Sequence, residues 1–156
     1  MTRAQAWLAP AAALLVGGSG LVYAWMRYLC EPRDEFALVN HPWQPLLQHL
    51  HVLAAPLLVF AVAALWAEHV WRRVRSGYPR QRPTGLVLFV LFFPMVFSGG
   101  WVQVAEGELA RTAAVWTHAL GGTLWCAAYA VHLVLHLLRG KTGPSGESAA
   151  ASSRSA

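Results

Sequence analysis

The sequence predicts an all-α membrane protein, a bundle of four transmembrane helices. The first observation is composition: of the 156 residues, 56% are hydrophobic and only 12% are charged. That charged fraction is about half of what a soluble domain carries. The second is that four long stretches are almost free of charge, approximately residues 6–26, 46–70, 86–104 and 115–138. Each is close to the roughly 20 residues that a helix needs to cross a hydrocarbon core about 30 Å thick.

The first stretch, 6–26, follows the short basic sequence Met-Thr-Arg and so shares a feature with secretory signals. Its apolar part is longer than the roughly 7–15 residues of a signal's hydrophobic region. We therefore expect it to remain in the protein as the first helix.

The basic residues predict the orientation, because arginine and lysine are in excess in cytoplasmic loops. Arg3 precedes the first segment, the connection WRRVRSGYPRQRPTG carries five arginines and no acid, and Arg139 and Lys141 follow the fourth segment. The other two connections contain acids. We expect both termini to be cytoplasmic and the acidic loops periplasmic, in a bacterial inner membrane. This bias accounts for the net charge of +5, so no nucleic-acid partner is inferred.

The predicted domain organisation is simple. Residues 1–139 form the four-helix transmembrane domain, and the small, polar stretch 140–156 forms a disordered cytoplasmic tail. Cys30 and Cys126 lie at different predicted depths, so we expect no disulfide between them. The chain has no Cys-x-x-Cys-His motif, which argues against covalently attached haem.

Four of the seven histidines occur at a repeated spacing. The stretches HVLAAPLLVFAVAALWAEH (51–69) and HALGGTLWCAAYAVHLVLH (118–136) both begin and end with histidine and are otherwise almost wholly apolar. This spacing corresponds to about five whole helical turns, so the two histidines of each stretch share one helix face, about 27 Å apart. The second and fourth segments cross the membrane in the same direction. We therefore expect His51 near His118 at the outer surface, and His69 near His136 at the inner surface.

Facing imidazoles at two depths predict two non-covalent haem b groups, each with two axial histidines. Polar residues within a membrane span are costly and usually functional, and neutral imidazole is a suitable ligand for iron. His51 and His118 would bind the outer iron, and His69 and His136 the inner one. Small residues follow the outer histidines by one turn and leave room for a porphyrin edge: Ala54, Ala55, Gly121 and Gly122.

Several alternatives stay open. His132 lies about 40° from the face of His118 and about 21 Å deeper, which makes it the rival of His136. His49 is about 200° around the helix from His51 and could replace it only if that helix were rotated. The runs Gly17–Gly20 and Ser98–Gly100 could make room for a porphyrin or simply allow close helix packing. Instead of haem, the histidines could bind Zn²⁺ or Cu⁺ in a transporter or sensor, or bridge helices in a cofactor-free structural or assembly subunit.

Charged side chains near the predicted haems have a candidate role. Arginines on the outer side (Arg27, Arg33, Arg111) and on the inner side (Arg72, Arg73, Arg75) could pair with haem propionates. Most of them are also accounted for by the membrane orientation.

The motif HALGGTLWCAAYAVHLVLH, with His118, a glycine pair and then His132 or His136, resembles the small four-helix di-haem b-type cytochromes. These serve as membrane subunits of bacterial formate dehydrogenases, hydrogenases and related complexes. The resemblance covers the four-span plan, residues 6–138. It implies an electron-transfer subunit, rather than a catalytic one, that passes electrons between a periplasmic redox protein or other subunits and the quinone pool.

This sequence departs from that family in one respect. The formate-dehydrogenase type takes a ligand from its first helix, which contains no histidine here. Ligation from the second and fourth helices is more similar to the cytochrome b of quinol-oxidising bc complexes. Ligand pairs about 14 residues apart are common in the family, which favours His132 more than geometry alone does and leaves the choice between His132 and His136 open. The resemblance also implies a quinone site, to which no residues are assigned.

Overall fold

The computed structural model describes residues 3–66, 75 and 82–141. Its elements are four helices: α1 (Arg3–Tyr28), α2 (Gln44–Leu65), α4 (Arg82–Val104) and α5 (Glu108–Lys141). Each contains a segment long and apolar enough to cross a membrane. The prediction of an all-α fold with four membrane-spanning helices is confirmed, and the chain is a multi-pass membrane protein.

The helix bounds differ from the predicted ones mainly at α5. This helix begins at Glu108, a full two turns before the predicted start at 115, because a helix can continue beyond the bilayer wherever its polar residues meet water. Glu108 lies in its first turn, where a negative charge favours the helix dipole. The end of the predicted second span, including His69, and the tail residues 142–156 lie outside the described residues.

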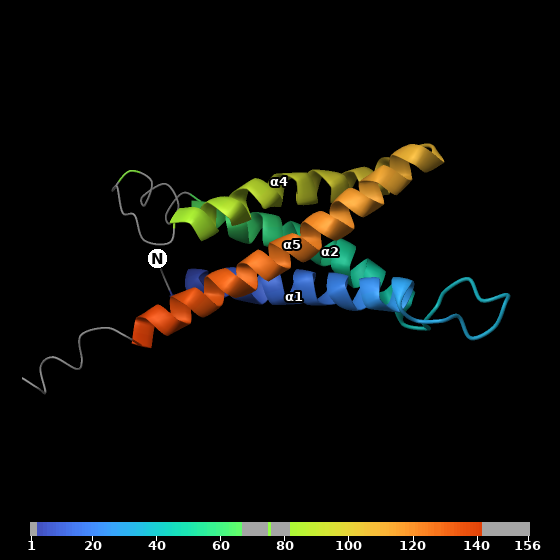
Figure 1. Ribbon diagram of the computed structural model, residues 1–156, viewed down its shortest axis with the longest axis horizontal. Helices are drawn as coiled ribbons and strands as arrows, with labels where there is room; N and C mark the ends of the chain where they lie inside the picture. The colour runs from blue at the N-terminus through green and yellow to red at the C-terminus, as the bar shows by residue number, and fades with distance from the viewer. Residues whose placement is uncertain (1–2, 67–74, 76–81, 142–156) are drawn as a thin grey trace, which may run out of the picture.

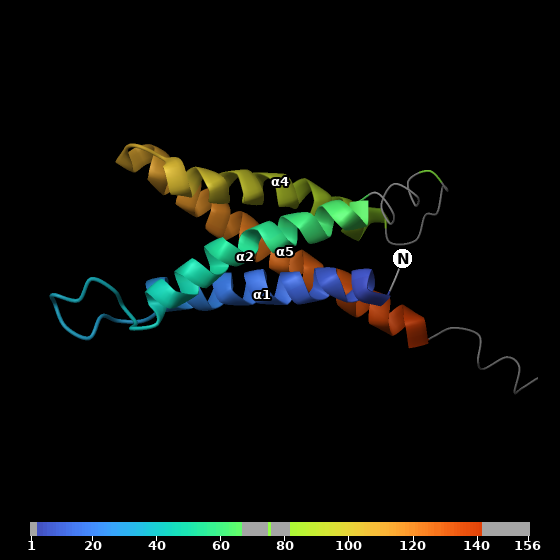
Figure 2. The same cartoon turned by 180° about the vertical axis from the view of Figure 1, so that it is seen from behind.

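The connections 29–43 and 105–107 lie at one end of the bundle, which we call the outer end (Figure 1). The start of α1, the end of α2, the start of α4 and the end of α5 lie at the opposite, inner end, as the reverse view also shows (Figure 2). The turn between α4 and α5 contains Gly107 at φ 85°, a left-handed conformation that glycine adopts without a steric penalty.

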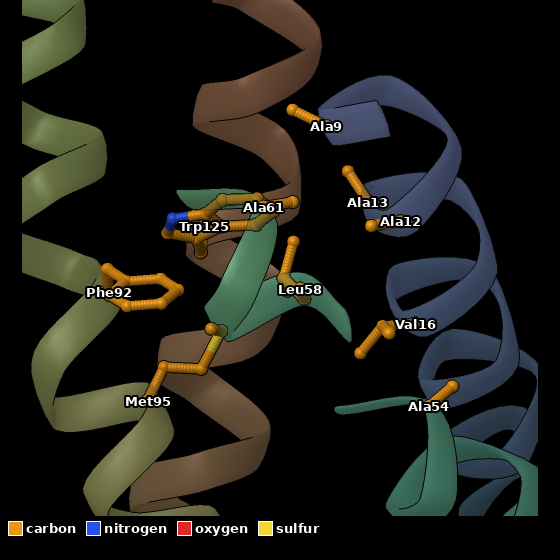
Figure 3. Close-up of a cluster of buried hydrophobic side chains, with 10 residues drawn as sticks. All are labelled: Ala9, Ala12, Ala13, Val16, Ala54, Leu58, Ala61, Phe92, Met95 and Trp125. Carbon is orange, nitrogen blue, oxygen red and sulfur yellow. The ribbon is translucent and has the colours of Figure 1, made fainter. Parts of the chain in front are cut away.

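The bundle consists of two antiparallel helical hairpins. Helix α2 packs mainly on α1 and α5 mainly on α4, while α1 also contacts α5. Small residues are buried on both α1 and α2, among them Ala12 and Ala13 of α1 and Ala54 and Ala61 of α2, as expected for closely packed membrane helices. Trp125 of α5 lies between the hairpins (Figure 3).

The exterior of the bundle is apolar. Large hydrophobic side chains on all four helices are exposed, for example Leu14, Leu53, Phe97 and Leu120. Such a surface would be unfavourable in water, whereas in a bilayer it faces hydrocarbon. These side chains therefore contact membrane lipid.

The orientation of the bundle in the membrane can be tested with reporter fusions. We expect green fluorescent protein fused after Ala156 to fluoresce and alkaline phosphatase at the same place to be inactive, because the positive-inside bias puts this end in the cytoplasm. The matched control is alkaline phosphatase fused within the outer connection, after Phe36, which we expect to be active. Active phosphatase at the C-terminus would contradict the orientation.

Candidate functional site

The centre of the site is a pair of facing histidines contributed by different hairpins. His51 of α2 and His118 of α5 have ring centroids 5.8 Å apart, with their planes at 64°. Both side chains are partly buried, at a depth well inside the membrane spans. The fold therefore brings together two titratable side chains from segments far apart in the sequence.

Each ring is fixed by a hydrogen bond to a backbone carbonyl of the neighbouring helix. His51 Nδ1 lies 2.9 Å from the carbonyl oxygen of Val16 on α1. His118 Nδ1 lies 2.8 Å from the carbonyl oxygen of Met95 on α4. Because a carbonyl oxygen can only accept, Nδ1 carries the proton in both rings. In the neutral imidazole, Nε2 then has a free lone pair and is the nitrogen available to a ligand.

A serine hydroxyl reinforces each of these carbonyls. Ser19 Oγ donates to the Val16 carbonyl at 3.1 Å and also lies 3.4 Å from His51 Nδ1. Ser98 Oγ lies 3.0 Å from the Met95 carbonyl oxygen and 2.5 Å from that of Pro94, so these two carbonyls share its one proton. Both serines are buried, so their hydroxyls are satisfied inside the helix packing rather than by lipid.

A glycine gives each ring its space. A Cβ atom at Gly20 would lie 2.7 Å from Cε1 of His51, and one at Gly99 would lie 2.8 Å from Cε1 of His118. Real Cβ atoms essentially never come so close to another heavy atom. The close approach of ring and backbone therefore requires glycine at both positions, so these glycines do more than allow helices to pack.

The two histidines line one large cavity between the hairpins. Its volume is about 870 Å³ and its lining is mostly apolar, within the roughly 300–1,000 Å³ of typical ligand sites. Ala55 and Gly122, both predicted to leave room for a ligand, are among the lining residues. Trp125 lines it toward the inner end, and Arg27 and Arg111 line it toward the outer end.

The residues that line the cavity repeat between the two hairpins. Every cavity-lining residue of α4 has a counterpart on α1 that also lines the cavity, at a constant offset in the sequence. The pairs are Val16 with Met95, Gly17 with Val96, Gly20 with Gly99, Leu21 with Gly100, Tyr23 with Val102 and Ala24 with Gln103. Lining residues of α2 and α5 pair in the same way, at a constant offset of their own. These pairs run from Gln48 with Val115 to Val59 with Cys126, and His51 with His118 is one of them. The two histidines are thus equivalent members of the two hairpins.

The other predicted site residues take different positions. Gly121 faces Met95 of α4, since a Cβ there would be 3.7 Å from the Met95 side chain, and Ala54 is buried in the α1–α2 contact. His49 and His136 are exposed. His132 Nδ1 lies 2.9 Å from the hydroxyl of Thr84 on α4. His69 lies outside the described residues.

Sequence reasoning did not find the groups that orient the histidines. The carbonyls of Val16 and Met95 have no signature, because every residue has a carbonyl. A signal was available in the dipeptide Ser-Gly, which occurs at Ser19–Gly20 and again at Ser98–Gly99. From the sequence, the small size of these residues predicts only room for a ligand or close helix packing, and their alignment with the histidines becomes visible in the structure.

No family model, curated protein or solved structure matches this chain. The geometry of the site therefore has to decide which ligand it fits. Within residues 3–66, 75 and 82–141 there is no group of three or more His, Cys, Asp or Glu side chains placed to hold a metal ion. Within the cavity, His51 and His118 are the imidazoles that the fold brings together.

The close contact of the His51 ring with Gly20, and of the His118 ring with Gly99, can be tested by adding a single methyl group to each glycine. We expect Gly20→Ala and Gly99→Ala to destabilise the protein by about 1–3 kcal/mol each, because the histidine ring must leave its carbonyl to avoid the new Cβ. The measurement is unfolding by SDS in mixed micelles.

Gly18→Ala on α1 and Gly85→Ala on α4 are the matched controls, since a Cβ at either position has no neighbour within 4 Å. Equal stability of the Gly20, Gly99 and control variants would show that the histidine rings do not sit against these glycines.

Proposed function

We propose that this protein is a b-type cytochrome in which one haem is held between His51 and His118. The observation that carries the proposal is the pair of imidazoles that face each other from separate hairpins, each with Nδ1 bonded to a carbonyl. Histidines that bind a metal almost always donate their other ring N–H to such an acceptor, which fixes the tautomer and the ring direction.

The distance between the rings fits a bis-imidazole iron. A metal–imidazole bond is about 2 Å long, so two nitrogens on opposite sides of one metal are about 4 Å apart and their ring centroids about 6 Å apart. The centroids of His51 and His118 are separated by 5.8 Å. Two protein ligands also match haem iron, whose remaining four come from the porphyrin, whereas a structural zinc site takes four from the protein.

The chain's own residues have three tasks at this site. His51 and His118 supply the axial nitrogens, the carbonyls of Val16 and Met95 hold those nitrogens in place, and the apolar lining excludes water. Axial ligands, their hydrogen bonds and burial are the main means by which a protein sets the potential of a haem. A bound haem supplies one-electron redox chemistry. The chain would act as the electron-transfer subunit of a larger complex in the bacterial inner membrane, between a periplasmic redox partner and quinone.

A second haem at the inner end remains part of the proposal, with His69 as one ligand. Of the two candidates on α5, the contact between His132 and Thr84 supports His132. In this contact Nδ1 of His132 has a partner on α4, as Nδ1 of His118 does, and the Thr84 hydroxyl can accept its proton. His136 is exposed. The described end of α2 also packs on α4, through Trp66 and Phe89 at 4.2 Å, and His69 follows Trp66 by three positions.

The outer haem is tested by substitution of its ligands. We expect the purified wild type to show a b-type spectrum when reduced with dithionite, and His51→Ala or His118→Ala to lose one haem per chain, because a single imidazole leaves the iron without its second axial ligand. Haem is counted as pyridine haemochrome. His49→Ala, on the exposed side of the same helix, is the matched control and should retain full haem.

Retention of all haem in both His51→Ala and His118→Ala would refute the ligand assignment. A wild type that binds Zn²⁺ or Cu⁺ and shows no haem absorbance would favour the transporter or sensor. Loss of stability in these variants without any spectral change would favour a cofactor-free assembly subunit.

The inner haem is tested by comparing the two candidates on α5. We expect two haems per chain in the wild type, one in His132→Ala and two in His136→Ala, since only His132 has its Nδ1 held by a neighbouring helix. One haem in His136→Ala and two in His132→Ala would assign the inner iron to His136. One haem in the wild type would remove the inner site altogether.

A further inference from the structure

Two arginines, one from each hairpin, lie at the outer mouth of the histidine cavity. Arg27, at the end of α1, and Arg111, in the second turn of α5, both line the cavity. They also line a smaller pocket of about 270 Å³ that adjoins it toward the outer surface. Two positive charges therefore face a shared space above the histidines.

Measured along their helices, Arg27 and Arg111 lie at a similar distance from the two histidine rings. Arg27 follows Gly20, which touches the His51 ring, by about two helical turns or roughly 10 Å. Arg111 precedes His118 by the same number of turns. This distance is on the scale of a porphyrin from its centre to its substituents. A flat ring gripped at its centre by the histidines would present its outer edge to the arginines.

Neither arginine is neutralised by an acid in the part of the chain that the structure describes. Acidic residues are present at the outer end, but none of those described makes an ion pair with Arg27 or Arg111. The Arg27 guanidinium carbon is 5.8 Å from the centre of the Tyr28 ring, and Tyr28 stacks on Trp116 of α5 at 5.7 Å. This stack joins the hairpins, and both of its rings line the smaller pocket together with the two arginines.

We infer that Arg27 and Arg111 form a carboxylate site that binds the two propionates of the haem, so that the propionate edge points to the outer end. The inference deepens the proposed function and depends on it. An arginine binds a carboxylate through two parallel hydrogen bonds, which gives direction as well as affinity. In the apolar cavity the opposite orientation would place both carboxylates among Leu58, Met95 and Trp125, without a charged partner. The arginines would thus select one of two orientations that the symmetric histidine pair alone does not distinguish.

The test combines variants of the protein with a modified ligand. Full-length apoprotein from haem-deficient cells, in nanodiscs, is titrated with haem and with haem dimethyl ester, in which both carboxylates are blocked. We expect the wild type to bind haem up to about 30-fold more tightly than the ester, because Arg27 and Arg111 are exposed and each ion pair of an exposed arginine contributes modestly. In R27Q/R111Q this preference should fall to near unity, while ester affinity stays the same. R33Q, an exposed arginine in the outer connection that lines neither space, should keep the wild-type preference.

Each other result has a distinct meaning. A wild type that binds haem and ester equally would overturn the inference and leave the proposed function standing. The same would follow if R27Q/R111Q kept the full preference. A shift of the haem midpoint potential by free succinate in the wild type, together with equal binding of haem and ester, would assign the arginines to an external carboxylate. Absence of binding by either ligand in a folded wild type would overturn the proposed function as well.

Discussion

The hydrogen bond from a histidine Nδ1 to a carbonyl of the next helix is the constraint on which this site depends. A carbonyl inside a transmembrane helix already accepts the amide four residues later, so the imidazole and the nearby serine hydroxyl meet at its second lone pair. The bond fixes the tautomer and aims Nε2 away from the helix pair. It also requires the ring to lie against the backbone four residues further along, because positions i and i+4 share a face. That position is Gly20 on α1 and Gly99 on α4.

The same set of groups occurs in both hairpins, and this repetition gives the site its symmetry. Each hairpin contributes a carbonyl, a serine three residues later, a glycine four residues later and a histidine from the second helix. Both hairpins run in the same direction along the bundle, so a two-fold axis along the bundle would relate them. A ligand on that axis meets the same chemistry from both sides. This matches a metal with two identical axial positions better than an asymmetric substrate.

The sequence was sufficient to predict the spans and the approach of His51 to His118, because both follow from length, hydropathy and helical period. It was not sufficient for features that depend on how helices cross. Gly121 was expected in the cavity, but a residue three positions after His118 is displaced from its face, and here it meets α4. His136 does share the face of His118. Helix α5, however, runs diagonally across the bundle (Figure 1), so that face is exposed at the inner end. A periodicity argument treats helices as parallel and cannot anticipate this.

The division into two hairpins also has an energetic consequence. Direct contacts between them include the stack of Tyr28 on Trp116, the facing histidines, the packing around Trp125 and the stack of Trp66 on Phe89, and a cavity of about 870 Å³ lies between the hairpins. A ligand that bonds to both histidines would therefore supply much of the contact between the hairpins. Because binding to the folded state alone stabilises that state, assembly of the two hairpins and binding of the proposed haem would be a single coupled equilibrium. The apolar lining strengthens this coupling, since without a ligand it leaves the cavity walls with few packing contacts.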